Sequence, residues 1–278
     1  EGGRFVSDRA ALVAFAQDSI SRGSKSFRFA SRLFDRTTRE RVWLLYAWCR
    51  KCDDMADGQD HGGSMEAVED PQERLRTIRE LTAMALAGTP TGAPAFDCLG
   101  VVARECGITP RMAEDVIEGF ALDAADWHPR RESDLYQYCY HVAGAVGVMM
   151  AVVMGVPADD DATLDRACDL GLAFQLANIA RDVAEDDAAG RCYLPDDWLA
   201  MLDIGPGEHM KPHNRKKLAL MGRWLADEAE QYEASARVGA KHLPLRARWA
   251  VLSAAGIYGE IARKVRASGA QAWDQRIF

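Results

Sequence analysis

Apolar residues recur three and four positions apart along almost the whole chain, which is the spacing of one face of an α-helix. No stretch alternates between apolar and polar residues for long enough to indicate a β-sheet. The pattern predicts helices over residues 8–21, 36–57, 71–87, 94–106, 110–125, 133–155, 160–186, 212–240 and 244–268. The loops between them, such as the glycine- and proline-rich residues 88–94, are too short to be domain linkers. We therefore expect one all-α domain over residues 1–278.

Local signals mark several of the predicted helix ends. Asp70 can act as an N-cap, Pro71 suits the first helical position, and Glu73 can complete a capping box. Thr109 followed by Pro110 opens another helix in a similar way. These ends are therefore expected at the first residue after each cap.

Two predicted helices, over residues 136–156 and 162–184, are unusually apolar for a bundle in water. A helix that is apolar on all sides belongs in the middle of a large core. The first of them contains a run of small residues that includes Gly144 and Gly147. Such residues either let neighbouring backbones approach closely or leave a tunnel for an apolar ligand, and the sequence leaves both interpretations open.

Composition and charge exclude some classes of protein. Lys and Arg number 34 against 42 Asp and Glu, which gives a formal net charge of −8. Since nucleic-acid binders normally carry a basic stripe, a nucleic-acid partner is not expected. The 7 cysteines are an odd number in a chain too long to need disulfides, so reduced thiols are expected. Cys49 and Cys52 form a CxxC that lacks the second half of a zinc site.

The sequence shows neither a signal peptide nor a membrane span. The N-terminal residues EGGRFVSDRA contain no apolar core and no amphipathic transit pattern. The longest apolar run, over residues 142–156, falls short of the ~18 residues that indicate a span. We expect a cytoplasmic protein that contacts the inner face of the membrane at most peripherally, through the amphipathic residues 246–266. The oligomeric state is left open.

A first polar stripe lies in the segment YAWCRKCDDMAD, where offsets of 0, 4, 7 and 11 put four residues on one helical face: Tyr46, Arg50, Asp53 and Asp57. The preceding turn is strongly apolar, so this helix is expected to be buried up to the stripe. Buried carboxylates must be paired, hydrogen-bonded or metal-bound. A salt bridge to Arg50 would satisfy this without any ligand, so the stripe alone is weak evidence for a site.

A second stripe, in GLAFQLANIARDVAEDD, has offsets of 0, 3, 7 and 11 and comprises Gln175, Asn178, Asp182 and Asp186. The helix before it is almost wholly apolar, and amide and carboxylate oxygens are costly there without a ligand. Mg²⁺ takes oxygen ligands, typically one or two carboxylates together with substrate phosphates. Two such stripes facing each other across a cavity would hold Mg²⁺ ions around a diphosphate.

Phosphate donors and aromatic residues complete the candidate site. The segment GSKSF offers hydroxyls, an ammonium group and backbone N–H groups before a helix, although a simple N-cap explains it equally well. Arg50 and Arg181 add fork-shaped donors beside the two stripes. Electron-rich rings that could line the cavity and stabilise a carbocation are Phe27, Tyr46, Tyr136, Tyr140 and Tyr258.

Five segments in order, GSKSF, YAWCRKCDDMAD, YCYHVAGAVG, FQLANIARDVAEDD and GRCYLP, together with the late segment QAWDQR, carry a resemblance to a known family. From Gly23 to Arg276 the chain resembles the squalene/phytoene synthase family, and most of all its bacterial phytoene-forming members. The resemblance implies the all-α isoprenoid synthase fold, with a helical bundle around a central cavity. It also implies a Mg²⁺-dependent prenyltransferase of carotenoid biosynthesis, with Mn²⁺ able to take the place of Mg²⁺ and no need for NADPH. Two molecules of geranylgeranyl diphosphate would be joined head to head, through prephytoene diphosphate, to phytoene with release of diphosphate.

The resemblance also implies roles for individual residues. Mg²⁺ would be bound by Asp53, Asp57, Asn178, Asp182 and Asp186. The diphosphate would be contacted by Ser24, Lys25, Ser26, Arg50, Gln175, Asn178, Arg181 and Arg276. The reacting carbons would lie near Tyr46, Arg50, Tyr140, Arg181 and Tyr258. The cavity would be lined by Phe27, Tyr136, Gly144 and Gly147.

Other functions use similar motifs. Squalene or dehydrosqualene synthesis from farnesyl diphosphate requires the same acidic stripes, and the sequence does not fix the length of the substrate. Head-to-tail elongases and terpene cyclases also pair acidic helices, but their second motifs differ from NIARDVAED. A non-catalytic helical scaffold of the same fold would have no need for two repulsive acidic pairs.

Overall fold

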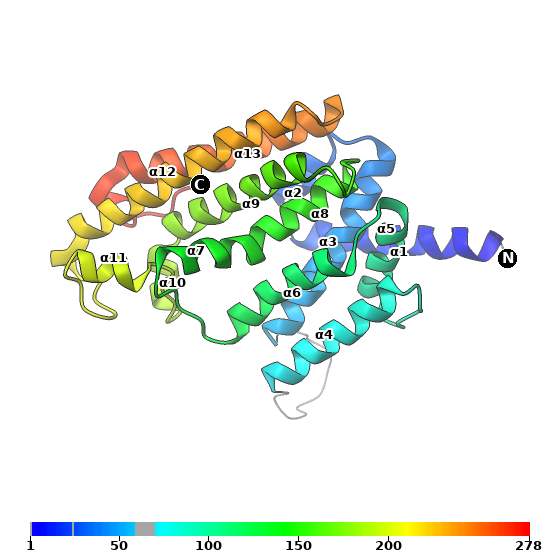
Figure 1. The fold of residues 1–278 in the computed structure, drawn as a ribbon, viewed down its shortest axis with the longest axis horizontal. Helices are drawn as coiled ribbons and strands as arrows, with labels where there is room; N and C mark the ends of the chain where they lie inside the picture. Colours follow the sequence, from blue (N-terminus) through cyan, green and yellow to red (C-terminus); the bar gives the residue numbers. More distant parts are fainter. Residues whose placement is uncertain (1, 24, 59–69) are drawn as a thin grey trace. The chain divides into compact units, whose positions relative to one another are not determined.

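The computed structural model describes residues 2–23, 25–58 and 70–278. Every regular element in these ranges is a helix, as the sequence predicts (Figure 1). The internal contacts divide the chain into two compact units whose segments alternate along the sequence. The first unit comprises Glu1–Ala125, Val148–Leu164 and His242–Ala250, and the second comprises Asp126–Gly147, Asp165–Lys241 and Val251–Phe278. A single domain over the whole chain stays a prediction.

The first unit is built around α3, which packs against α1, α4, α5 and α6. Its helices are α1 (Gly2–Gly23), α2 (Lys25–Ser31), α3 (Arg36–Ala56), α4 (Pro71–Leu86), α5 (Pro94–Cys106) and α6 (Pro110–Ala124). Trp48 of α3 is fully buried, and its indole N–H donates to Thr82 Oγ1 at 3.2 Å. The prediction that α3 is buried up to its acidic end is therefore confirmed.

The predicted helix starts are confirmed as well. Asp70 accepts a hydrogen bond from the backbone N–H of Gln72 at 3.3 Å, and α4 begins at Pro71. Thr109 accepts one from Met112 N–H at 3.3 Å, and α6 begins at Pro110. Each cap satisfies an N–H group that the first turn of a helix leaves without an intrahelical partner.

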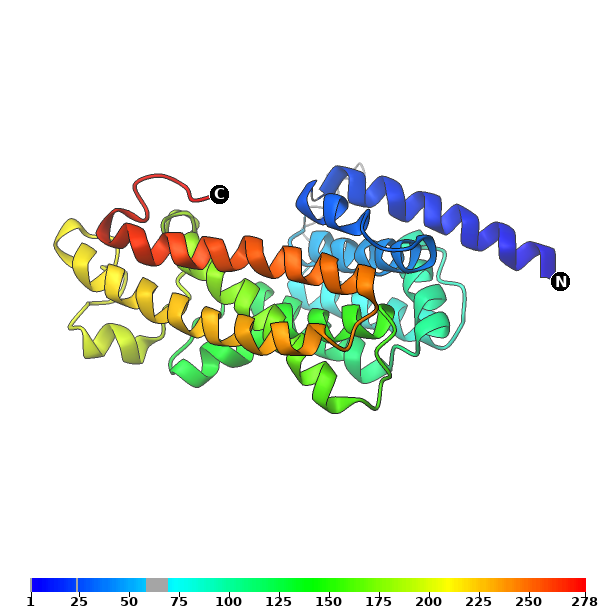
Figure 2. The same cartoon turned by 90° about the horizontal axis from the view of Figure 1, so that it is seen from above.

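The second unit contains α7 (Glu132–Cys139), the π-helix η1 (Tyr140–Gly144), α10 (Val183–Ala188), α11 (Asp196–Met201), the 3₁₀ turn η2 (Pro212–Asn214), α12 (Arg215–Ala240) and the 3₁₀ turn η3 (Gly269–Gln271). Most of α9 (Asp161–Arg181) and α13 (Leu245–Ser268) belongs to it, while α8 (Ala145–Val153) crosses between the units. Figure 2 shows α12 and α13 running side by side. Arg266 of α13 forms ion pairs with Asp227 and Glu230 of α12, which tie the two helices together.

The predicted helix over 160–186 is wrong at one point, because the helix breaks at Asp182 into α9 and α10. Asp182 has φ −97° and ψ 15°, outside the helical range. The predicted helix over 133–155 likewise contains the π-helical turn η1, where the backbone widens around Tyr140. The spacing of apolar residues does not indicate the break at Asp182 or the π-helical turn, because after each of them the apolar residues continue on nearly the same helical face.

The small residues of η1 and α8 pack closely against α9. A Cβ atom added to Gly147 would lie 2.6 Å from the carbonyl oxygen of Ala167, and one added to Gly171 would lie 2.3 Å from that of Ala143. A Cβ added to Gly144 would lie 2.8 Å from Cys168 Sγ. Close backbone approach therefore accounts for Gly144 and Gly147, and their predicted place in a cavity wall stays a prediction.

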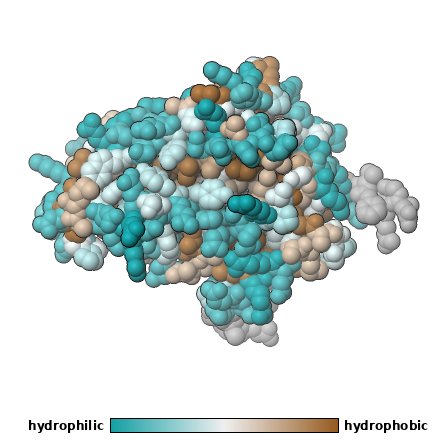
Figure 3. Space-filling view, in the orientation of Figure 1, coloured by the Kyte–Doolittle hydropathy of each residue, from teal (hydrophilic) through white to brown (hydrophobic). Residues whose placement is uncertain are grey.

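The cysteines carry free thiols, as expected. Burial raises the pKa of the Cys49 thiol to about 12, so it stays protonated near neutral pH. No helix in the described ranges has both the length and the apolarity needed to cross a membrane. Figure 3 shows one face of the molecule, on which hydrophilic residues predominate and apolar residues form small separate groups.

Candidate active site

The first acidic stripe lies at the end of α3, within the first unit. Tyr46 is half-buried, and its hydroxyl lies so close to the end of α1 that a Cβ atom on Gly23 would come within 1.8 Å of it. Burial raises the pKa of the Tyr46 hydroxyl, so it stays protonated near neutral pH. Gly23 thus leaves the space that the hydroxyl of Tyr46 occupies.

The carboxylates of this stripe are more exposed than the sequence predicts. The Asp53 side chain is 44% exposed, and Asp57 is exposed as the C-cap of α3. Arg50 pairs at 2.8 Å with the neighbouring Asp54 and only at 3.4 Å with Asp53. Partial burial and repulsion by Asp57 raise the pKa of Asp53, and Arg50 offsets this only in part. The stripe therefore carries uncompensated negative charge, which suits a bound cation.

The second stripe lies at the junction of α9 and α10, within the second unit. Arg181 donates two parallel hydrogen bonds to Asp182, from Nε to Oδ1 at 2.5 Å and from Nη2 to Oδ2 at 2.6 Å. These bonds raise the pKa of the Arg181 guanidinium. Both side chains are mostly buried, at 17% and 22% exposure. This fork–fork pair fixes the orientation of the Asp182 carboxylate.

Asn178 supplies the observation that best fits a ligand. Its Oδ1 atom is buried and has no hydrogen-bond partner among the described residues. An unpaired buried carbonyl oxygen costs about 1–3 kcal/mol. Asn178 lies one turn before Asp182, and an amide oxygen beside carboxylates is a normal ligand for a hard divalent cation. This donor set therefore fits Mg²⁺.

Neither stripe forms a complete metal cage. The described residues contain no group of three or more His, Cys, Asp or Glu side chains close enough to hold a metal ion. Mg²⁺ usually keeps several waters and takes further oxygens from substrate phosphates, so one or two carboxylates suffice. The stripes fit an ion that arrives with a diphosphate.

The predicted phosphate-binding segment is only partly described. Ser24 lies outside the described residues, and so do the side chains of Lys25, Ser26 and Phe27, whose backbone opens α2. Gln175 is half-buried on α9, three residues before Asn178. Arg276 lies near the second stripe, with its Nη2 atom 3.8 Å from Asp182 Oδ1. The structure thus brings Arg181, Asp182 and Arg276 together.

Two of the predicted aromatic residues, Tyr136 and Tyr140, lie on α7 and on η1, which follows it directly. Tyr140 is the first residue of the π-helix, and its ring meets that of His141 edge-on at 4.9 Å. Short π-helical turns occur frequently at functional sites. Tyr136, one turn earlier, donates from its hydroxyl to Glu132 at 2.8 Å, and burial together with this bond raises its pKa.

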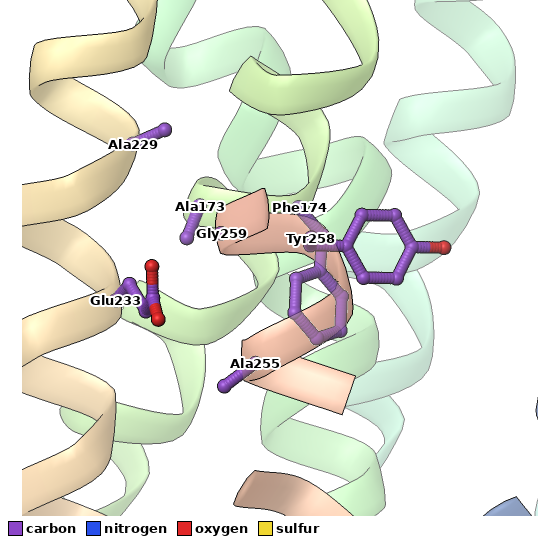
Figure 4. A pocket seen from close by; sticks show the side chains of 7 residues that line it. All are labelled: Ala173, Phe174, Ala229, Glu233, Ala255, Tyr258 and Gly259. Carbon is purple, nitrogen blue, oxygen red and sulfur yellow. The ribbon is translucent and has the colours of Figure 1, made fainter. Parts of the chain in front are cut away.

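Tyr258 of α13 lines a pocket in the second unit (Figure 4). Its ring stacks on Phe174 of α9, with centroids 4.1 Å apart and planes inclined by 22°. The pocket is shallow and partly open to solvent, and its remaining lining residues are Ala173, Ala229, Glu233, Ala255 and Gly259. Figure 4 shows the Tyr258 hydroxyl pointing away from Glu233. The aromatic pair forms one side of the pocket, and small residues together with Glu233 form the rest.

The sequence did not single out Glu233, a charged residue that is only 6% exposed. Its carboxylate pairs with Arg237 at 2.7 Å and lies 3.7 Å from Arg263 of α13. A Cβ atom on Gly259 would come within 2.1 Å of Glu233 Oε2, so the glycine next to Tyr258 makes room for the carboxylate. Its burial could have been inferred from its position four residues after Ala229, on the apolar face of α12.

A second buried residue outside the predicted set is His209. It is 2% exposed and lines a pocket with Asp186 and Cys192. Its Nε2 atom lies 3.4 Å from Asp187 Oδ1, without the geometry of a hydrogen bond. Burial lowers the pKa of His209, which keeps the imidazole neutral near pH 7. Through His209, the loop before η2 therefore contacts α10.

Comparisons with known proteins give the same picture as these motifs. The family model described as squalene/phytoene synthase matches residues 20–278. The phytoene synthase of Pseudescherichia vulneris and the 15-cis-phytoene synthase of Pantoea ananas are each 48% identical to this chain over 267 residues, which covers 95% of this chain and 86% of each relative.

Solved structures agree in fold. The crystal structure of a dehydrosqualene synthase superposes with a TM-score of 0.82 at 28% identity, covering 95% of this chain and 89% of that one. The squalene synthase HpnC from Alicyclobacillus acidocaldarius superposes with a TM-score of 0.83 at 22% identity, covering 94% of this chain and 95% of that one. The all-α isoprenoid synthase fold is thereby confirmed. On its sequence motifs and on these matches, the chain belongs to the squalene/phytoene synthase family.

Proposed function

We propose that this chain makes phytoene by joining two molecules of geranylgeranyl diphosphate head to head, through prephytoene diphosphate. One observation carries the proposal: both acidic stripes, with Arg50 and Arg181 beside them, are intact in a chain 48% identical to proteins named phytoene synthase. The buried, unpaired Oδ1 atom of Asn178 supports a ligand at the second stripe. A non-catalytic scaffold would have no need for two such acidic stripes.

Mg²⁺ is the proposed metal, with Mn²⁺ as a substitute. Its proposed ligands are Asp53 and Asp57 of the first stripe and Asn178, Asp182 and Asp186 of the second. When bound, the metal neutralises the negative charge that develops on the departing diphosphate. Arg181 holds Asp182 in a fixed orientation, so part of this site is preorganised.

The chain's own side chains would carry the other steps. Arg50, Arg181 and Arg276, with Ser24, Lys25, Ser26 and Gln175, would hold the diphosphate oxygens as the first allylic cation forms. The aromatic rings of Tyr46, Tyr140 and Tyr258 would stabilise the cation while the second prenyl chain attacks it. Loss of a proton closes the cyclopropane ring. The second ionisation then releases the other diphosphate, and the rearranged cation loses a second proton to give phytoene. Exclusion of water from the site would keep the cation from being trapped.

The alternative is squalene or dehydrosqualene synthesis from farnesyl diphosphate. It is favoured only by the fold match to a dehydrosqualene synthase, at 28% identity. Squalene formation requires a reductant, whereas phytoene formation does not. We therefore expect phytoene from geranylgeranyl diphosphate with Mg²⁺ alone, and no effect of NADPH on product identity.

The test is incubation of the purified chain with geranylgeranyl or farnesyl diphosphate, with and without Mg²⁺ and NADPH, followed by product identification. The Asp182→Asn variant serves as the matched control, because it keeps the shape of the side chain and removes its charge. A faster reaction with farnesyl diphosphate, or no turnover of either substrate with Mg²⁺, would contradict the proposal.

We further propose peripheral contact with the cytoplasmic membrane. A forty-carbon hydrocarbon cannot leave into water at a useful concentration, so a lipid surface must receive it. α13 exposes Leu245, Trp249 and Ile257, each more than half accessible, on a helix that also carries arginines. Apolar and basic side chains on one helix suit the interface of an anionic bilayer.

A further inference from the structure

The segment after α13 is joined to the end of α9 by one buried hydrogen bond. The indole N–H of Trp273 donates to the carbonyl oxygen of Ala180 at 2.8 Å, across 93 residues of sequence. In Figures 1 and 2 this segment turns back from the end of α13 towards the junction of α9 and α10. All three elements belong to the second unit.

The bond has a local cause in the break of the helix at Asp182. The last carbonyl groups of a helix have no intrahelical donor and need partners from elsewhere. The backbone N–H of Asp182 serves the carbonyl of Asn178 at 2.9 Å, and the indole serves that of Ala180. The indole therefore caps α9 two residues before the carboxylate of Asp182.

Packing holds the indole in this position. Trp273 is 9% exposed, and a Cβ atom on Gly222 of α12 would lie 3.0 Å from its Cζ2 and Cη2 atoms. Glycine at 222 thus provides the space that the ring fills. Trp273 is fixed between α12 on one side and the end of α9 on the other.

Arg276 follows Trp273 by three residues and is held far less tightly. Its guanidinium lies 3.8 Å from Asp182 and 4.0 Å from Glu185, and its side chain is 50% exposed. Exposed ion pairs at such distances contribute little by themselves. They cannot account for the placement of the segment. Lys264 Nζ donates to the carbonyl of Phe278 at 2.9 Å, and the buried indole bond is the contact that joins the segment to the end of α9.

We propose that Trp273 is a positioning residue, which caps the broken end of α9 and thereby holds Arg276 beside the second acidic stripe. This inference rests on the proposed function only in taking the second stripe as the place where a metal-bound diphosphate is held. Arg276 forms no hydrogen bond with Asp182 at 3.8 Å, so its guanidinium is available to the anion. Because Trp273 already fixes the segment that carries Arg276, less conformational entropy is lost when Arg276 contacts the anion. This is preorganisation.

The test compares Trp273→Phe, which keeps an aromatic ring and loses the N–H, with Arg276→Ala and with the double variant. Trp249→Phe is the matched control, because Trp249 is 55% exposed on α13. The first readout is hydrogen–deuterium exchange over residues 274–278. We expect faster exchange in Trp273→Phe and in Gly222→Ala, which crowds the ring, and no change in the control.

The second readout is calorimetric binding of inorganic diphosphate in the presence of Mg²⁺. Loss of a charge-assisted contact corresponds to roughly tenfold weaker binding, which we expect for Arg276→Ala and in large part for Trp273→Phe. The double variant should be no weaker than Arg276→Ala, because both changes remove the same contact. Additive losses would overturn the positioning role.

Each outcome separates this inference from the proposed function. Unchanged exchange in Trp273→Phe refutes the anchoring, whatever product the enzyme makes. Coupled losses of diphosphate binding in a chain that makes no phytoene would leave the anchoring intact and refute the substrate assignment alone.

Discussion

Replacing Asp53 by asparagine should separate metal binding from folding at the end of α3. The carboxylate is partly buried and repelled by Asp57, and both effects raise its pKa. A like-charge pair one turn apart costs about 0.2–0.5 kcal/mol, and Asp53→Asn removes it. The variant also loses the 3.4 Å pair with Arg50, an exposed interaction worth roughly 0–1 kcal/mol, while Arg50 keeps Asp54 at 2.8 Å.

These contributions nearly cancel, so the free energy of unfolding without metal should change by less than about 0.5 kcal/mol, or roughly 1–2 °C in Tm. The pH dependence has a definite sign. Because the folded-state pKa of Asp53 is raised, its ionisation disfavours the folded state above that pKa, and the penalty disappears as the pH falls through it. Any stability advantage of Asp53→Asn at pH 7 should therefore vanish towards pH 4.

With Mg²⁺ and inorganic diphosphate at a hundred times their Kd, the wild-type chain should gain about 2.7 kcal/mol, or roughly 5–10 °C in Tm. Asp53→Asn should lose most of this gain at the same concentrations, and its turnover should fall by orders of magnitude. Asp54→Asn, one residue further along α3, is the matched control and should keep the thermal shift.

The measurement is thermal unfolding followed by circular dichroism, with and without the ligands. A fall of more than about 4 °C in the metal-free Tm of Asp53→Asn would mean that the carboxylate is structural. An unchanged ligand-induced shift would mean that the first stripe holds no metal. Either result refutes the reasoning.

The remaining predictions concern packing, the second half-reaction and the membrane. Gly171→Ala should lower the free energy of unfolding by about 1–3 kcal/mol, because its Cβ would meet the backbone of η1. Gly256→Ala, with open space around its Cβ, should raise that free energy by about 0.4–1 kcal/mol, and equal Tm values would contradict the packing argument. Tyr258→Ala should lose phytoene more than first-step turnover, so that prephytoene diphosphate accumulates and is detected as its alcohol after phosphatase treatment. Equal loss of both steps with a lower Tm would favour packing alone. In a flotation assay the wild-type chain should bind anionic liposomes, and Trp249→Glu should bind less. Absence of binding by the wild type would refute the membrane proposal.

Local chemistry in the sequence determined the helices and the order of the motifs. Helix starts at Pro71 and Pro110 follow from the cap in front of each, because capping depends only on residues within one turn. The acidic stripes were likewise visible from spacing alone, since offsets of three and four residues define a helical face. Together with their flanks, they were enough to identify the family and the all-α fold.

Packing between residues far apart in the sequence determined features that the spacing of residues within one helix does not indicate. The sequence allowed the small residues at Gly144 and Gly147 either to pack closely or to line a tunnel, and only the position of α9 shows the close contact. Burial of Glu233 depends on Gly259 from another helix, which no pattern within α12 contains.

The second stripe shows both contributions at once. Its residues follow a helical spacing, but the backbone breaks at Asp182, and the carbonyl of Ala180 is satisfied by Trp273 from 93 residues away. A helix can end inside a run of apolar periodicity when a distant donor forms a hydrogen bond with a backbone carbonyl. That carbonyl would otherwise accept from the N–H group of the next helical turn. The sequence by itself therefore determined which residues gather at the stripe, and the tertiary structure alone decided how they are held.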